Sequence, residues 1–278
     1  MNSTEGHSAS LSRLVGRLWG HRSLILTLTR REVVGRYKGS VFGILWSFIN
    51  PLVMLSVFTF VFGEIFKAKW GGDGPAQTGH LEFAVALFAG LLQYNLFAEC
   101  IGKAPYLVTN QPNYVKKIVF PLDTLPVVAM LAALFHFAIA YGIILVLAAI
   151  SQWQFHWTVL YTPLIMMPFV LLVLGVTWGL AALGVYLRDI GQLVPPALTA
   201  FLFLSPVFYP LSAVSPKLQV IYRLNPLTQV IEQVRGALLF GRSPDWATFW
   251  PYAIVCTVIG WLGFVVFQKT RQGFADVI

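Results

Sequence analysis

Side chains that could do chemistry are scarce in this sequence and form no catalytic pattern. Charged residues make up 11% of the 278 residues, well below the roughly 25% of average soluble domains. No G-x-x-x-x-G-K-S/T phosphate loop, H-E-x-x-H, C-x-x-C or G-x-S-x-G motif occurs. The acidic residues Glu32, Glu99 and Asp123 are scattered, without the paired spacing of an acid–base site. We therefore expect no catalytic residue, metal or cofactor in this chain.

One short segment, residues 112–121, could transmit force to a partner. Pro112 can begin a helix, and Pro121 cannot continue one. The pattern predicts a short helix on the cytoplasmic face, although a surface turn with solvated lysines fits equally well. The segment combines the apolar stripe Tyr114, Val115, Ile118 and Val119 with Lys116 and Lys117.

Aromatic residues make up 15% of the chain, and many lie within apolar runs. Lipid-facing bulk and belts at the membrane interface explain most of them. The alternative is a lining on which sugar rings stack, and the candidates for it are Trp46, Phe201 and Tyr209.

The N-terminal 40 residues carry a different pattern, with a basic and an apolar face. Leu14, Leu18, Ile25 and Leu28 share one stripe at helical spacing. A basic amphipathic helix in the lipid headgroup plane fits residues from about 11 onward better than a disordered basic tail. The basic residues assigned to this interfacial helix are Arg30, Arg31, Arg36 and Lys38.

Long apolar runs must position these residues. The first run has 22 residues without a charge, which as a helix spans about 33 Å, enough for a hydrocarbon core of about 30 Å. Asn50-Pro51 should kink it. We predict an all-α membrane protein with six transmembrane helices. The expected spans are 41–62, 83–98 with an extension of a residue or two, 125–150, 158–187, 192–211 and 249–267.

The polar stretch 212–248 separates the last two expected spans. Asn225 is a suitable N-cap, Pro226 suits the first helical position, and Gly241 lies beyond the expected end. We predict two short re-entrant helices at the outer face, one over residues 217–224 and one that follows Asn225. Neither helix is long enough to cross the membrane. The apolar positions Leu227, Val230, Ile231, Val234 and Leu238 recur at helical spacing.

Charge distribution sets the expected topology. Thirteen of the 19 Lys and Arg residues fall on the side that holds both chain ends, so both termini should be cytoplasmic. The net charge of +8 then reflects contact with lipid headgroups rather than binding of nucleic acid.

We divide the chain into a cytoplasmic segment, 1–40, and a six-helix transmembrane domain, 41–278. No signal peptide is expected, Cys100 and Cys256 should be free thiols, and His136 a packed or interhelically bonded residue rather than a proton relay.

The chain resembles the transmembrane subunits of ABC-2 type polysaccharide exporters, which serve O-antigen, group 2 capsule and teichoic acid export. The likeness runs from about residue 24 to the C-terminus, and Gln93-Tyr94 departs from the Pro-Trp that relatives often have. Four stretches carry it: residues 31–40 leading into Leu45-Trp46 and Asn50-Pro51; residues 113–121; Arg188-Asp189-Ile190; and Ser205-Pro206-Val207 with Asn225-Pro226-Leu227.

This resemblance implies a homodimer that binds two copies of a separate ATP-binding cassette subunit, with ATP and magnesium in that partner. It implies that residues 114–118 form the helix that couples to the ATPase. It also implies a polymer channel lined by the first and fifth spans in the bacterial inner membrane. The substrate would be a lipid-linked polysaccharide, with O-antigen, capsule and teichoic acid all open. A membrane-embedded enzyme of lipid-linked glycan synthesis is the alternative function.

Overall fold

The computed structural model describes residues 11–65, 80–116, 120–152 and 156–277, and within these ranges helices are joined by turns and loops, with no β-strand. The helices run in the order α1 Leu11–Gly20, α2 Arg22–Tyr37, η1 Gly43–Leu45, α3 Trp46–Phe58, η2 Thr59–Ile65, α4 His80–Lys103, η3 Ala104–Tyr106, α5 Pro112–Lys116, α6 Thr124–Gln152, η4 Trp157–Tyr161, α7 Thr162–Tyr186, α8 Ile190–Phe203, η5 Leu211–Ala213, α9 Pro216–Leu224, α10 Pro226–Leu239, α11 Trp246–Thr270, η6 Arg271–Gly273 and α12 Phe274–Val277.

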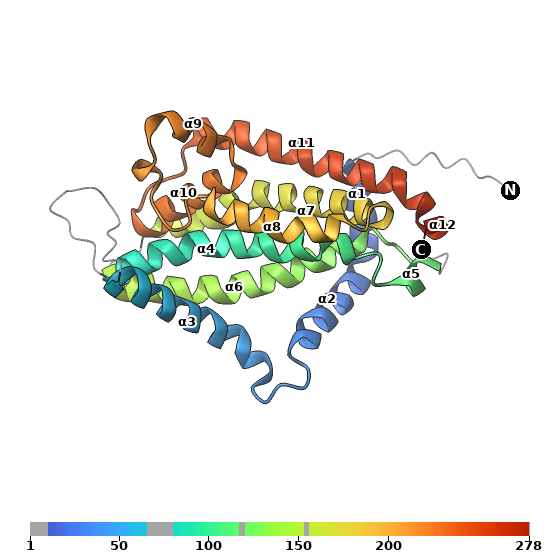
Figure 1. The fold of residues 1–278 in the computed structure, drawn as a ribbon, viewed down its shortest axis with the longest axis horizontal. Helices are drawn as coiled ribbons and strands as arrows, with labels where there is room; N and C mark the ends of the chain where they lie inside the picture. The colour runs from blue at the N-terminus through green and yellow to red at the C-terminus, as the bar shows by residue number, and fades with distance from the viewer. Residues whose placement is uncertain (1–10, 66–79, 117–119, 153–155, 278) are drawn as a thin grey trace.

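Five apolar helical segments of the described chain are long enough to cross a membrane. They correspond to five of the six expected spans. In Figure 1 the long helices run along the longest axis, with α1, α5 and α12 toward one end and α9 and α10 toward the other. The five segments are Gly43–Ile65, Glu82–Tyr106, Thr124–Ile150, Trp157–Tyr186 and Trp246–Val277.

The expected fifth span is a shorter helix than the sequence predicted. α8 has 14 residues, which extend about 21 Å at the standard rise. It ends at Phe203, three residues before Pro206, which has no backbone N–H to continue the helical ladder. The chain then turns. The carbonyl oxygens of Pro206 and Val207, which would bond within a longer helix, accept hydrogen bonds from Arg235 of α10 instead.

The second span extends further than predicted. α4 continues to Lys103 rather than ending at residue 98, and it carries Glu99 and Lys103 on its last two turns. These two charges form an i,i+4 pair with an N–O distance of 3.4 Å. The helix therefore continues beyond the expected extension of a residue or two, because ion pairs accommodate the charges of Glu99 and Lys103.

α4 lies at the centre of the core and packs against α6, α7, α8 and α10. α7 and α11 form the most extensive contact between two helices of the described chain, since Gly175, Gly260 and Gly263 let the two backbones meet without intervening side chains. The predicted apolar face of α10 is confirmed, because Leu227, Val230, Ile231, Val234 and Leu238 are all buried.

The N-terminal segment contains two helices rather than one, with a break at His21. α2 and α3 form a V that stands out from the other helices (Figure 1). Gly39 and Gly43 in the turn between them have φ of +88° and +51°, a region that residues with a Cβ rarely adopt. This turn brings the end of α2 and the start of α3 to one side of α4 and α6.

Candidate functional site

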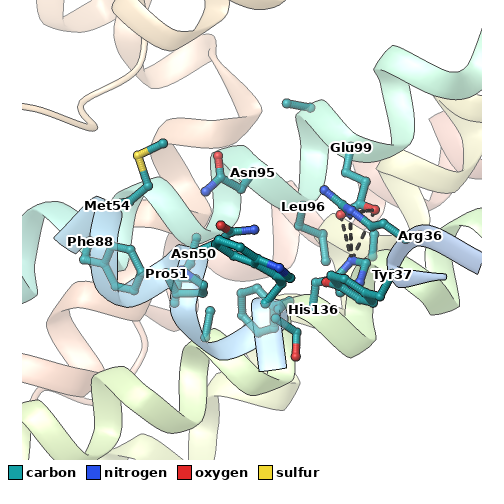
Figure 2. A pocket seen from close by; sticks show the side chains of 17 residues that line it. Arg36, Tyr37, Asn50, Pro51, Met54, Phe88, Asn95, Leu96, Glu99 and His136 are labelled. Atoms are coloured by element: carbon teal, nitrogen blue, oxygen red, sulfur yellow. Dashed lines mark hydrogen bonds and ion pairs between the residues drawn. The ribbon is translucent and has the colours of Figure 1, made fainter. Parts of the chain in front are cut away.

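A pocket of about 460 Å³ lies where the V of α2 and α3 meets α4 and α6. Figure 2 shows its labelled side chains, with Met54 and Phe88 toward one end and Arg36, Glu99 and His136 toward the other. The lining comprises Arg36, Tyr37, Trp46, Ser47, Asn50, Pro51, Met54, Phe88, Leu92, Asn95, Leu96, Ala98, Glu99, Ala133, His136, Phe137 and Ala140.

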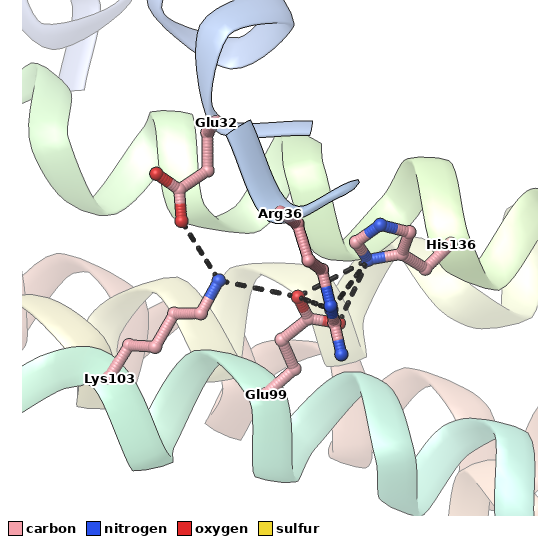
Figure 3. A network of polar contacts seen from close by, with 5 residues as sticks. All are labelled: Glu32, Arg36, Glu99, Lys103 and His136. Atoms are coloured by element: carbon pink, nitrogen blue, oxygen red, sulfur yellow. Dashed lines mark hydrogen bonds and ion pairs between the residues drawn. The ribbon is translucent and has the colours of Figure 1, made fainter. Parts of the chain in front are cut away.

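An ion-pair network closes the charged end of this pocket (Figure 3). Arg36 Nη1 of α2 donates to Glu99 Oε1 of α4 at 2.7 Å. His136 Nδ1 of α6 lies 3.1 Å from Glu99 Oε2. Lys103 Nζ lies 2.9 Å from Glu32 Oε1 and 3.4 Å from Glu99 Oε1. Arg36 and His136, which lie 100 positions apart in sequence, thus both contact the Glu99 carboxylate, and this one group joins α2, α4 and α6.

The charged side chains of this network are buried to different extents, and the strength of each ion pair depends on that burial. The Glu99 side chain is 16% exposed, whereas that of Arg36 is 51% exposed. Glu99 is therefore held in a poorly solvated place, where its charge requires the cations around it. The prediction that His136 is interhelically bonded is confirmed by its contact with Glu99.

Tyr37 adds a hydroxyl beside the network. Its ring lies edge-on to His136, with ring centroids 6.0 Å apart. Burial raises the pKa of the Tyr37 hydroxyl, an effect that nearby Arg36 opposes and Glu99 reinforces. The group is a neutral donor and acceptor around physiological pH.

Two carboxamides line the middle of the pocket. Asn50 of α3 and Asn95 of α4 are exposed, and Figure 2 shows them between the two ends. Asn50 precedes Pro51 in α3 and Asn95 lies one turn before Glu99. Neither side chain hydrogen-bonds to any other residue of the described chain.

The three predicted channel aromatics lie in different places. Trp46, the first residue of α3, lines the pocket. Phe201 lines a separate apolar groove of about 350 Å³ and packs on Phe97, with centroids 5.6 Å apart. Tyr209 bonds to the Tyr222 hydroxyl at 2.8 Å. Only Trp46 therefore joins the pocket, and the shared lining role remains a prediction.

The predicted interfacial cations surround a second cavity, of about 1010 Å³. Arg31, Arg36 and Lys38 line it together with Lys103 and the acidic Glu32. Arg30 is exposed on the same helix but is not part of this lining. Arg36 contributes to both cavities, so the two adjoin at its guanidinium.

The predicted coupling segment is only partly described, because Lys117 and Ile118 and the side chain of Lys116 lie outside the described residues. Tyr114 stacks on Phe120, with centroids 4.1 Å apart. Tyr114 and Val115 also pack against a buried cluster that includes Val108 and Phe274. These two half-buried side chains therefore contact their own subunit, and their coupling to an ATPase remains a prediction.

The buried cation Arg235 of α10 escaped the sequence analysis. Its side chain is 2% exposed and donates to the carbonyl oxygens of Ala86, Pro206 and Val207. Asn225 also reaches the end of α8, bonding Leu204 O at 3.0 Å and Ser205 Oγ at 2.9 Å. The signal was available, since position 235 continues the buried spacing of Ile231 and Leu238.

Comparison with known proteins identifies the family of this chain. The sequence profile of the family described as ABC-2 type transporter matches residues 23–239, which is most of the chain. The chain belongs to the ABC-2 type transporter family. As an ABC-2 membrane subunit it is a transport protein whose sequence contains no ATPase phosphate loop. This membership removes the alternative of a membrane-embedded enzyme.

Individual ABC-2 relatives are similar over nearly their whole length. An O-antigen export system permease protein, RfbA of Myxococcus xanthus, is 29% identical over 96% of this chain and 99% of its own. RfbA of Klebsiella pneumoniae is 22% identical over 92% of this chain and 95% of its own. The polysialic acid transport protein KpsM of Escherichia coli is 24% identical over 87% and 91%.

Proposed function

We propose that this ABC-2 subunit is the permease of an ATP-driven exporter that moves a lipid-linked surface polysaccharide, such as O-antigen or capsule, across the bacterial inner membrane. The observation that carries this proposal is the end-to-end similarity to permeases named for O-antigen and polysialic acid transport. Energy comes from a separate subunit that binds ATP and magnesium, because this sequence has no phosphate loop.

The proposed assembly is a homodimer with two ATPase copies, in which the polymer passes between the permeases. Two-fold dimers are the commonest oligomers. The subunit has six spans when α8 and the residues after it are counted as the fifth. Residues 1–40 form the cytoplasmic segment, and 41–278 the transmembrane domain. The gathering of α1, α5 and α12 at one end supports cytoplasmic termini (Figure 1).

A deletion and complementation experiment tests this function. Removing the gene should strand a lipid-linked glycan on the cytoplasmic side, detected by its resistance to reagents that label only the cell surface. Restoring this chain together with its ATPase should return the glycan to the surface. Restoring it with an ATPase whose phosphate-loop lysine is replaced should not. Normal surface glycan in the deletion strain would contradict the proposal.

Coupling is assigned to the segment that follows Pro112. Tyr114 and Val115 are half-buried against their own subunit, and the proposed contact with the ATPase comprises residues 114–118. An apolar side chain in a groove contributes affinity, whereas a rim lysine mainly affects the association rate.

Three variants separate these contributions. Ile118→Ala should reduce ATPase co-purification at all salt concentrations. Lys116→Ala with Lys117→Ala should reduce it only modestly and at low salt. Val220→Ala, which removes an exposed apolar side chain from α9 at the other end, is the control. Unchanged co-purification of the Ile118 variant would move the coupling role to the N-terminal helices.

A further inference from the structure

The pocket between α2, α3, α4 and α6 has a chemistry that lipid does not explain. Asn50 and Asn95 present free carboxamides on segments that cross the membrane. A carboxamide without a hydrogen-bond partner is unfavourable in hydrocarbon. Since both side chains line the same pocket, the pocket is a place for a polar molecule rather than for acyl chains.

The remaining lining narrows the class of that molecule. Trp46, Tyr37 and Phe137 supply aromatic rings, and the C–H face of a sugar ring packs on such rings. The carboxamides, the Tyr37 hydroxyl and the Arg36–Glu99 pair offer both donors and acceptors to hydroxyl groups. The charges of Arg36 and Glu99 offset each other, which favours a neutral, hydroxyl-rich ligand.

The adjoining cavity indicates which part of a substrate lies here. Arg31, Lys38 and Lys103 line it with one carboxylate, Glu32, and it shares Arg36 with the pocket. This excess of cations suits a phosphate. A ligand in which a sugar follows a phosphate would put one group on each side of Arg36.

We infer that the pocket binds the sugar next to the phosphate-bearing lipid end of the exported glycan, with the phosphate in the basic cavity beyond Arg36. This inference rests on the proposed export function and adds the end of the substrate that each subunit recognises. Asn50 and Asn95 then bond to sugar hydroxyls, and Trp46 stacks on the ring.

Site-specific photo-crosslinking tests the placement directly. Met54 lines the pocket, whereas the adjacent Val53 does not, and the two are similarly exposed, at 53% and 51%. Benzoylphenylalanine at each position is irradiated in cells that carry metabolically labelled glycan and an ATPase-inactive partner. Labelled glycan should attach at position 54 and not at 53. Equal labelling at both positions, or crosslinks from 54 only to a second copy of this chain, would overturn the inference.

Substitutions provide an independent readout in the complete transporter. Asn50→Leu with Asn95→Leu should lower the export rate by about tenfold, the effect of losing about two hydrogen bonds. Thr257→Val, at an exposed polar residue of α11, is the control and should export normally. Expression, ATPase co-purification and ATP hydrolysis should match the unmodified transporter.

The outcomes distinguish the inference from the function on which it rests. If the unmodified transporter exports glycan and the asparagine variant keeps its export rate within twofold, the sugar site is wrong and the exporter assignment stands. If the unmodified transporter exports no glycan, the proposed function itself fails. Competition by glucose 1-phosphate, glucose and inorganic phosphate for the crosslink at position 54 then separates the two cavities. The sugar phosphate should compete best, and competition by phosphate alone would remove the sugar from the site.

Discussion

At the scale of single residues, Glu99 concentrates the charge interactions where α2, α4 and α6 meet. One largely buried carboxylate accepts from Arg36 and Lys103 and contacts His136. Through Lys103 the same network includes Glu32 of α2. α2 is therefore held to the bundle by charge as well as by its two buried apolar side chains, Ile25 and Val33.

Replacing this carboxylate should loosen α2. Glu99→Gln keeps the size of the side chain but leaves the cations without their anion. We expect a loss of about 1–2 kcal/mol, below the value for a fully buried pair because Arg36 is half exposed. Thermal unfolding of the purified transporter measures this loss. In a double-mutant cycle, Arg36→Gln should cost less in the Glu99→Gln background than alone, and strict additivity would show that the pair is not coupled.

Arg235 is a buried cation that bonds mainly to backbone carbonyls, with Glu232 as an i,i+3 ion-pair partner at 3.4 Å. Its guanidinium satisfies carbonyls of α4 and of the segment after α8. Arg235→Met should leave these buried oxygens unpaired at a cost of about 1–3 kcal/mol each. Arg235→Lys should fail too, because an ammonium lacks the planar fork. Limited proteolysis of residues 204–245 reads out the expected loosening, and full resistance in both variants would contradict it.

At the scale of elements, the contact between α7 and α11 depends on glycine. A Cβ at Gly263 would collide with the Gly175 carbonyl, whereas a Cβ at Gly179 meets nothing within 4 Å. Gly263→Ala should separate the helices and reduce the yield of folded protein. Gly179→Ala should be neutral or stabilise by up to about 1 kcal/mol through helix propensity. Size-exclusion chromatography and melting temperature compare the two, and equal behaviour would refute the close-contact account.

The elements also show how far sequence reasoning reaches. Hydrophobic period and capping residues predicted α10 well, including the Asn225 cap on Leu227, because both signals are local. The predicted C-terminal ends of α4 and α8 differ from the observed ones, because both ends depend on partners that are distant in sequence. Lys103 and Glu99 extend α4 by pairing with α2, and Arg235 binds the carbonyls beyond α8. Glu32 and Glu99, which looked scattered, meet through Lys103. No spacing rule anticipates contacts across 71 residues.

At the scale of the whole molecule, the arrangement of the ends bears on topology. A reporter that is active only in the cytoplasm should work when fused after Ile278, since the excess of Lys and Arg lies on that side. The same reporter inserted in the 212–248 region should be inactive. If a reporter that is active only in the periplasm works at the C-terminus, the orientation is the opposite of the one predicted.

Both cysteines are buried as free thiols, so a non-reducing gel should show no intramolecular disulfide.

The central position of α4 has a consequence for how the protein is made. Among the five long apolar segments, α4 has the lowest hydropathy and the greatest burial. Yet α6, α7, α8 and α10, which cover much of its surface, are all synthesised later. During translation α4 must therefore leave the insertion machinery while Glu99 still lacks His136. Glu32 and Arg36 of α2 are synthesised before α4. They therefore offer opposite charges to Lys103 and Glu99 before the rest of the chain has been made.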